Sequence, residues 1–177
     1  WYRRLSMPMM LTSRMTTATE VSLTLDISVD ESLVSVPDVT RWQAAADAAL
    51  AVAQTDNLDR EWRHSVSVNV VSRDDSEALN TDWRDKHKPT NVLAFPMPEM
   101  PAVPGIIPSA GELILCDDVI VAEATDQNKP VEHHYLHMIV HGCLHLLGYD
   151  HLASDEADHM ESLERQALEK LGVENPY

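Results

Sequence analysis

The segment VEHHYLHMIVHGCLHLLGYDH, residues 131–151, combines an apolar helical pattern with a cluster of histidines. Its apolar residues recur every three or four positions, which is typical of a helix with one face in the core. They are Leu136, Ile139, Val140, Cys143, Leu144 and Leu147. Gly148 follows this pattern, and a glycine with positive φ commonly ends a helix. The segment therefore predicts a core helix over 131–148 and a turn after it.

The histidines of this segment have the spacing of a metal site. His141 and His145 lie one helical turn apart and point the same way, as two imidazoles do when a helix presents them to zinc. After the turn at Gly148, His151 can return to the same point as a third ligand. Three nitrogen ligands leave a fourth position for water, as in catalytic zinc sites. We predict one zinc ion per chain, held by His141, His145 and His151.

A row of solvated histidines is the alternative interpretation, because every fourth residue from His133 to His145 is a histidine. The glycine at the turn and the histidine after it favour the metal site. Asp150 is expected either to orient a ligand imidazole or to form the turn. The other histidines are expected at the surface or beside the site. They are His64, His87, His133, His134, His137 and His159.

The sequence around this helix predicts one α+β domain. Alternating or short apolar runs predict four strands, at 21–30, 64–72, 91–95 and 111–116. Helical spacing predicts five helices, at 38–54, 74–87, 117–127, 131–148 and 154–172, the last capped by Ser154 and Asp155. We expect a small mixed sheet of about four strands packed with about five helices over residues 20–177, with the zinc site at the end of a central helix. Residues 1–19 are expected to be an extension or a remnant of cloning, which can be disordered.

The charge of the chain limits its partners. A formal net charge of −16 over 177 residues argues against broad electrostatic affinity for nucleic acids or anionic membranes. A nucleic-acid substrate would need a local basic cleft, and Arg84, Lys86 and Lys88 form a basic patch. The Arg84 guanidinium suits phosphate recognition, although a surface ion pair with Asp82 or Asp85 is the simpler alternative.

Cysteine usage and hydropathy indicate a cytoplasmic protein. The two cysteines, Cys116 and Cys143, each follow an apolar run and are expected to be buried free thiols in a reducing compartment. No apolar run approaches the length of a membrane span. We therefore expect no membrane partner.

The histidine spacing also occurs in metzincin peptidases, whose pattern is H-E-x-x-H-x-x-G-x-x-H. In this chain the second position holds Gly142, so the glutamate that serves as general base in those peptidases is missing. The spacing thus keeps the zinc geometry and weakens the prediction of a peptidase.

The segment 141–151 resembles the hallmark of the YbeY endoribonucleases, H-G-x-L-H-L-x-G-Y-D-H, at every fixed position. The resemblance extends over about residues 64–177. It includes NTDWRDKHKPTNVLAFP at 80–96, GELILC at 111–116 and the acidic segment DEADHMESLERQALEKLG at 155–172. Ala94 stands where this family usually has serine, and Glu112 where it usually has aspartate.

The resemblance implies a zinc-dependent endoribonuclease directed at single strands of RNA rather than at DNA. It implies roles in ribosomal RNA maturation, at the 3′ end of the small-subunit RNA, and in ribosome quality control, with the ribosome or ribosomal proteins as partners. It also implies that Arg84 lies near the metal. We accordingly predict catalytic roles for Arg84 and His141.

Two other functions remain open from the sequence. One is a zinc hydrolase of another substrate, such as a peptide, with a base supplied from elsewhere, for example by Glu112. The other is a non-catalytic ribosome-associated module in which zinc only fastens the end of the 131–148 helix. The identity of the general base does not follow from the sequence in either case.

Overall fold

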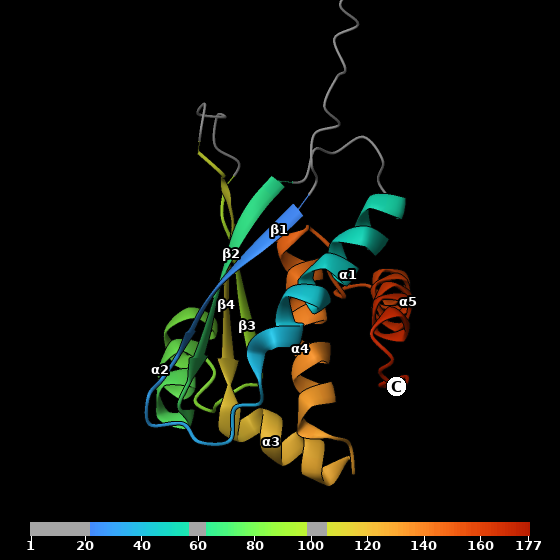
Figure 1. The fold of residues 1–177 in the computed structure, drawn as a ribbon. Coiled ribbons are helices and arrows are strands. Elements are labelled where there is room, and N and C mark those ends of the chain that lie inside the picture. Colours follow the sequence, from blue (N-terminus) through green and yellow to red (C-terminus); the bar gives the residue numbers. More distant parts are fainter. Residues whose placement is uncertain (1–21, 57–62, 99–105) are drawn as a thin grey trace, which may run out of the picture.

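The computed structural model describes residues 22–56, 63–98 and 106–177 of the chain (Figure 1). The predicted extension, residues 1–19, lies outside the described residues. The strands are β1 (Ser22–Val29), β2 (Arg63–Val71), β3 (Val92–Pro96) and β4 (Ser109–Cys116). The helices are α1 (Trp42–Asp56), α2 (Arg73–Arg84), α3 (Asp117–Asp126), α4 (Val131–Leu146) and α5 (Ser154–Lys170). Each predicted strand and helix is present within a few residues of its expected bounds.

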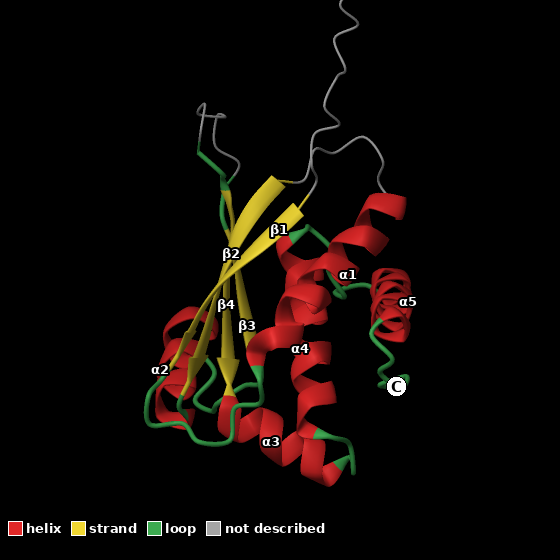
Figure 2. Ribbon diagram, viewed as in Figure 1, coloured by secondary structure: helices red, strands yellow, loops and turns green. Residues whose placement is uncertain are grey.

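The four strands form one mixed sheet in the order β1-β2-β4-β3. β1 pairs with β2 and β2 with β4 in parallel, whereas β3 pairs with β4 in antiparallel register. Helices α1, α4 and α5 lie on one side of this sheet and α2 lies on the other (Figure 2). The predicted α+β class, with a mixed sheet of four strands and five α-helices in the described residues, is confirmed.

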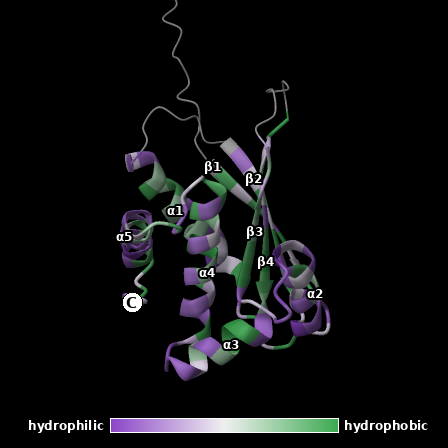
Figure 3. Cartoon of the chain, turned by 180° about the vertical axis from the view of Figure 1, so that it is seen from behind, coloured by the Kyte–Doolittle hydropathy of each residue, from purple (hydrophilic) through white to green (hydrophobic). Residues whose placement is uncertain are grey.

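Helix α4 lies in the core, where it packs against α1, β3 and β4. Its predicted apolar face is buried, with Leu136, Ile139 and Leu144 all 0% exposed. Alanines on α1 are buried too and let the two helices approach closely, and Trp42 of α1 stacks on Tyr135 of α4 with ring centroids 5.3 Å apart. In Figure 3, β3 and β4 are mostly hydrophobic and α5 mostly hydrophilic, as expected of a helix with one face in water.

The end of α4 takes the form that the sequence predicts. Gly148 has a φ of 96°, a conformation that L side chains rarely adopt. Its N–H donates to the His145 carbonyl at 3.0 Å, and the Tyr149 N–H donates to the Leu144 carbonyl at 3.0 Å. These bonds close the helix and turn the chain back, so that His151 lies near the helix it has just left.

Two smaller expectations have different outcomes. Helix α5 does not use Ser154 or Asp155 as its cap, because the Ala153 N–H donates instead to the Glu156 carboxylate at 3.1 Å. Cys116 and Cys143 are buried free thiols, as predicted, and burial raises the pKa of Cys143 to about 12. Among the described residues, no helix is long and apolar enough to cross a membrane.

Candidate metal centre

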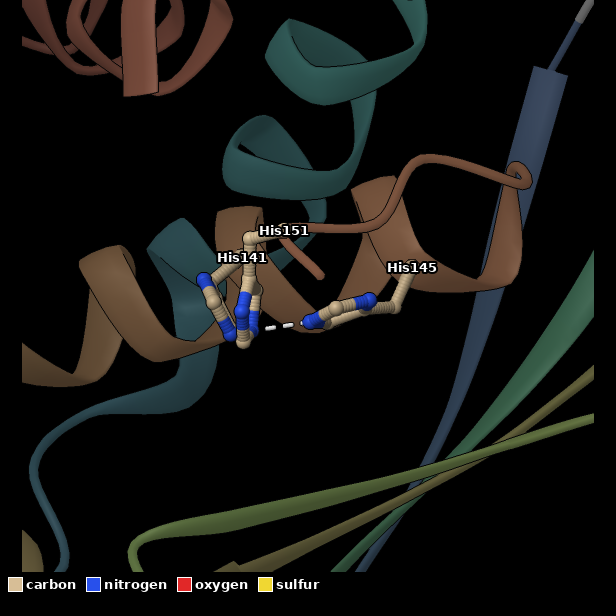
Figure 4. A group of neighbouring side chains, drawn as sticks. All are labelled: His141, His145 and His151. Atoms are coloured by element: carbon tan, nitrogen blue, oxygen red, sulfur yellow. Dashed lines mark hydrogen bonds between the residues drawn. The ribbon is translucent and has the colours of Figure 1, made fainter. Parts of the chain in front are cut away.

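Three imidazoles converge where α4 ends. His141 and His145 come from the last two turns of α4, and His151 comes from the segment that follows the turn (Figure 4). Each offers a ligand nitrogen, and these nitrogens all lie within 4.8 Å of one another. The Nε2 atoms of His141 and His145 are 3.1 Å apart. Two nitrogens bound to one tetrahedral zinc at its usual bond length would lie roughly 3.3 Å apart, so the spacing fits that ion.

Hydrogen bonds on the far side of two of the rings fix their orientation. His141 Nδ1 lies 2.7 Å from Glu164 Oε1, and His145 Nδ1 lies 3.0 Å from the Tyr149 carbonyl oxygen. A carbonyl oxygen and an ionised carboxylate can only accept, so each Nδ1 carries the proton. Each Nε2 then has a free lone pair facing the other ring, which is the form that a metal requires.

Glu164 is a buried carboxylate that the sequence analysis did not single out. It lies on α5, is 1% exposed, and accepts hydrogen bonds from His137 Nε2 at 2.9 Å, from His141 and from the Tyr177 hydroxyl. Burial alone would raise the pKa of Glu164, but the bonds from His137 and His141 outweigh burial and hold it well below its usual range. A negative charge is therefore fixed behind the metal site.

The sequence does contain a signal for Glu164. Residues 160, 163, 164, 167 and 168 all face the core, and the other four are Met160, Leu163, Ala167 and Leu168. A charged residue within such a stripe is rarely buried without a partner. The stripe could therefore have indicated a buried carboxylate with a specific partner, although not which partner.

His145 is also held in the form that binds metals. Burial first, and then charge repulsion from the neighbouring His141 and His151, lower its pKa to about 4. In the metal-free protein the imidazole is therefore neutral near pH 7. A neutral imidazole binds a metal without first losing a proton.

The other histidines divide into exposed and buried groups. His87 and His159 are exposed, as predicted, and His64 and His133 are partly buried. His134 was expected either at the surface or beside the site; it is 4% exposed, and Glu123 accepts a hydrogen bond from its Nε2 at 2.8 Å. His137 is beside the site, as one of the two predicted possibilities had it, since it shares Glu164 with His141.

A cleft of about 650 Å³ lies over the three histidines. Arg84 and Lys86 line it together with the three imidazoles, whereas Lys88 is not among its lining residues. Arg84 is the last residue of α2, and Asp85 then turns the chain with a φ of 54°. Within the described residues Arg84 forms no ion pair with Asp82 or Asp85, so the surface pairing considered from the sequence is not found.

The structure also bears on the peptidase alternative. Gly142, at the position of the metzincin glutamate, packs against β4, and a Cβ there would lie 2.7 Å from Leu113 Cδ2. Glu112 is the neighbour of Leu113 on β4, so its side chain points to the opposite face of the sheet, and its Oε1 accepts a hydrogen bond from Asn69. Neither position supplies a base to the cleft.

Asp150 lines the cleft, but its carboxylate binds the backbone of the turn and not a ligand imidazole. Its Oδ1 accepts a hydrogen bond at 2.8 Å from the backbone N–H of His151, the next residue. Asp150 thus forms the local turn that positions His151, which was one of the two roles expected of it.

Comparison with known proteins identifies the family of this chain. The family model of endoribonuclease YbeY matches residues 26–172. The chain is 43% identical over 155 residues to endoribonuclease YbeY of Chromohalobacter salexigens, covering 88% of this chain and 99% of that protein. A Thermotoga maritima protein solved in solution shares the fold at 22% identity, with a TM-score of 0.53 over 87% of this chain and 93% of the other. With most of its length matched by both the family model and a close relative, the chain belongs to the YbeY endoribonuclease family.

Proposed function

We propose that this chain is a zinc-dependent endoribonuclease that cleaves single-stranded RNA in the cleft over His141, His145 and His151. One observation carries the proposal: two cations and three convergent imidazoles share a single cleft, against one carboxylate, Asp150, in a chain of net charge −16. A cleft of that composition attracts a phosphodiester, while the rest of the surface repels nucleic acid. The name of the curated relative supports RNA as the substrate.

The three histidines would hold one zinc ion per chain. When bound, zinc would supply Lewis acidity toward the phosphodiester. The residues of the chain do the rest. The Arg84 guanidinium binds a nonbridging oxygen pair and stabilises the charge that builds on the phosphate, and Lys86 adds a second positive charge at the cleft. Glu164 holds His141 in the orientation and tautomer that the site needs. His141 is a catalytic residue because it would bind the zinc ion directly.

The biological setting is the part of the proposal that rests mainly on the family. It comprises maturation of ribosomal RNA at the 3′ end of the small-subunit RNA, ribosome quality control and a cytoplasmic location. The charge of −16 makes the ribosome or its proteins the expected source of much of the binding affinity, because few phosphates can be neutralised by this surface. Residues 20–177 would act as one domain.

A paired assay tests the function. Zinc-loaded protein is incubated with a single-stranded RNA oligonucleotide and, separately, with casein. We expect cleavage of RNA and none of casein, and we expect His145→Ala to abolish the RNA cleavage. His159→Ala is the matched control, because His159 is exposed and does not line the cleft.

Each other result favours a different function. Casein cleavage would indicate a peptidase. RNA cleavage that persists in His145→Ala would come from a contaminating nuclease. One zinc ion per chain with cleavage of neither RNA nor casein would favour the non-catalytic module.

A further inference from the structure

Trp83 is a large aromatic residue that the proposed chemistry does not use. It lies one residue before the end of α2 and is 69% exposed, whereas Trp42 is 0% exposed. Its ring contacts Phe95 of β3, with centroids 5.5 Å apart and the ring planes at 64°. Rings that meet edge to face cover little of each other, so most of the indole remains available to a ligand.

The position of Trp83 relates it directly to the cleft. Phe95 is the strand residue between Ala94 and Pro96, and both of these line the cleft. Because side chains alternate along a strand, Phe95 points to the other face of the sheet, where α2 lies. β3 is an edge strand, so only its own width, roughly 5 Å, separates the rim of the cleft from the face that carries Trp83.

The residues that follow Trp83 carry a net positive charge, because Arg84, Lys86 and Lys88 outnumber Asp85, although Asp82 precedes the indole. Arg84 follows it directly and lines the cleft, and Lys86, His87 and Lys88 continue as an exposed stretch. An exposed aromatic ring beside a group that binds phosphate is the combination by which proteins hold single-stranded nucleic acids: the cations take the backbone, and the ring stacks on a base. The positive stretch is complementary to RNA in a chain that is otherwise strongly acidic.

We propose that Trp83, supported by Phe95, is a stacking site for an unpaired base of the RNA whose phosphate lies at Arg84. The proposal rests on the proposed function. It gives the single-strand preference a physical cause, because a base held in a duplex is already stacked and cannot cover the indole. An RNA strand that leaves the cleft over the edge strand β3 meets Trp83 next.

Binding and cleavage of a short single-stranded RNA test the site in the zinc-loaded full chain. A stacked base contributes enough binding free energy that Trp83→Ala should weaken affinity about 5- to 100-fold. Trp83→Phe keeps a ring against Phe95 and should recover part of the affinity. RNA should quench the tryptophan fluorescence of the wild type, and this quenching should be lost in Trp83→Phe. A purely structural role for Trp83 would not produce that signal.

An RNA with one abasic position separates stacking from general effects. Wild type should bind the intact oligonucleotide more tightly than the abasic one, and Trp83→Ala should bind the two with nearly equal affinity. Val34→Ala is the control, because Val34 is 95% exposed and apolar but does not line the cleft. Zinc content and the midpoint of urea unfolding, measured for each variant, show whether the variants fold.

The outcomes distinguish this proposal from the function on which it rests. If wild type fails to cleave RNA, the proposed function is wrong. If wild type cleaves RNA, and a folded Trp83→Ala variant binds and cleaves it equally well, only the stacking site is wrong. A variant that keeps its RNA affinity and loses co-sedimentation with ribosomal subunits would mean that this surface binds protein, which also overturns the stacking site.

Discussion

Glu164 Oε1 accepts a hydrogen bond at 2.7 Å from His141 Nδ1, and this bond joins α5 to α4 directly behind the candidate metal centre. The same carboxylate accepts a bond from His137 Nε2 through its other oxygen. Both oxygens are therefore occupied by imidazole N–H groups that can only donate. A single buried charge thus fixes the ring that presents Nε2 to the ion, although it lies outside the cleft.

Glu164→Gln should weaken zinc binding about 10- to 100-fold, as the loss of a residue that orients a metal ligand typically does. Glutamine offers one accepting oxygen and one donating NH₂ group, so one of the two imidazoles must face a donor. Competition with a chelator of known affinity measures the change. Glu169→Gln, an exposed substitution on the same helix, is the control. An unchanged zinc affinity in folded Glu164→Gln would remove Glu164 from the site.

The sequence was sufficient to predict most of the fold. Short strands and helices were found by their own periodicity, and Gly148 marked the end of α4 because its φ of 96° is open mainly to glycine. The three histidines were predictable because i, i+4 spacing and a turn bring them together without help from the rest of the chain. Local geometry determines all of these features.

Contacts between distant segments were harder to predict. Glu164 is 23 positions from His141, and only the packing of α5 on α4 brings them together. The burial of His134 against Glu123 across the α3–α4 interface was not predicted either, because nothing near His134 in sequence indicates this partner. Such pairs depend on how helices dock, and the spacing within each helix does not specify this.

Gly142→Ala should destabilise the protein by about 1 kcal/mol. The added Cβ would lie 2.7 Å from Leu113 Cδ2, and overpacking a core typically costs about 1–3 kcal/mol. The better helix propensity of alanine offsets about 1 kcal/mol of this. Urea unfolding measures the difference. The loss in a Gly142→Ala, Leu113→Ala double variant should be smaller than the sum of the two single losses, and strict additivity would contradict the contact.

The free energy of unfolding should depend on pH through the protonation of the Glu123 carboxylate. The hydrogen bond from His134 is the largest cause that lowers its pKa below the ordinary 4.5, ahead of burial, which acts in the opposite direction. A lowered carboxylate pKa stabilises the fold fully above the ordinary value, and this contribution is lost as the pH falls through the lower folded value.

The wild type should therefore exceed Glu123→Gln in unfolding free energy by about 1 kcal/mol between pH 5 and 7. The hydrogen bond from His134 ends on an ionised carboxylate, but that carboxylate is partly exposed, which keeps the contribution small. The difference should shrink below about pH 4.5, where the unfolded carboxyl begins to bind protons first. Urea unfolding across this pH range measures it. Asp126→Asn, an exposed change on the same helix, should show no such trend. A gap that stays constant down to pH 3 would contradict the assignment.

Replacing Arg84 distinguishes zinc binding from RNA cleavage. Its guanidinium stays charged and has no acceptor, so it cannot ligate zinc, and Arg84→Ala should leave zinc content and folding nearly unchanged. If Arg84 meets the phosphate mainly as charge builds on it, the single-turnover rate of RNA cleavage should fall about 10²–10³-fold, more than the affinity falls. Arg84→Lys should recover only part of the rate, because an ammonium keeps the charge and loses the planar fork.

Arg73→Ala is the matched control: Arg73 begins the same helix, is exposed and does not line the cleft, so its loss should leave the rate near that of wild type. Equal rates for wild type and Arg84→Ala would return Arg84 to the solvated surface and leave the three histidines to account for the chemistry without it.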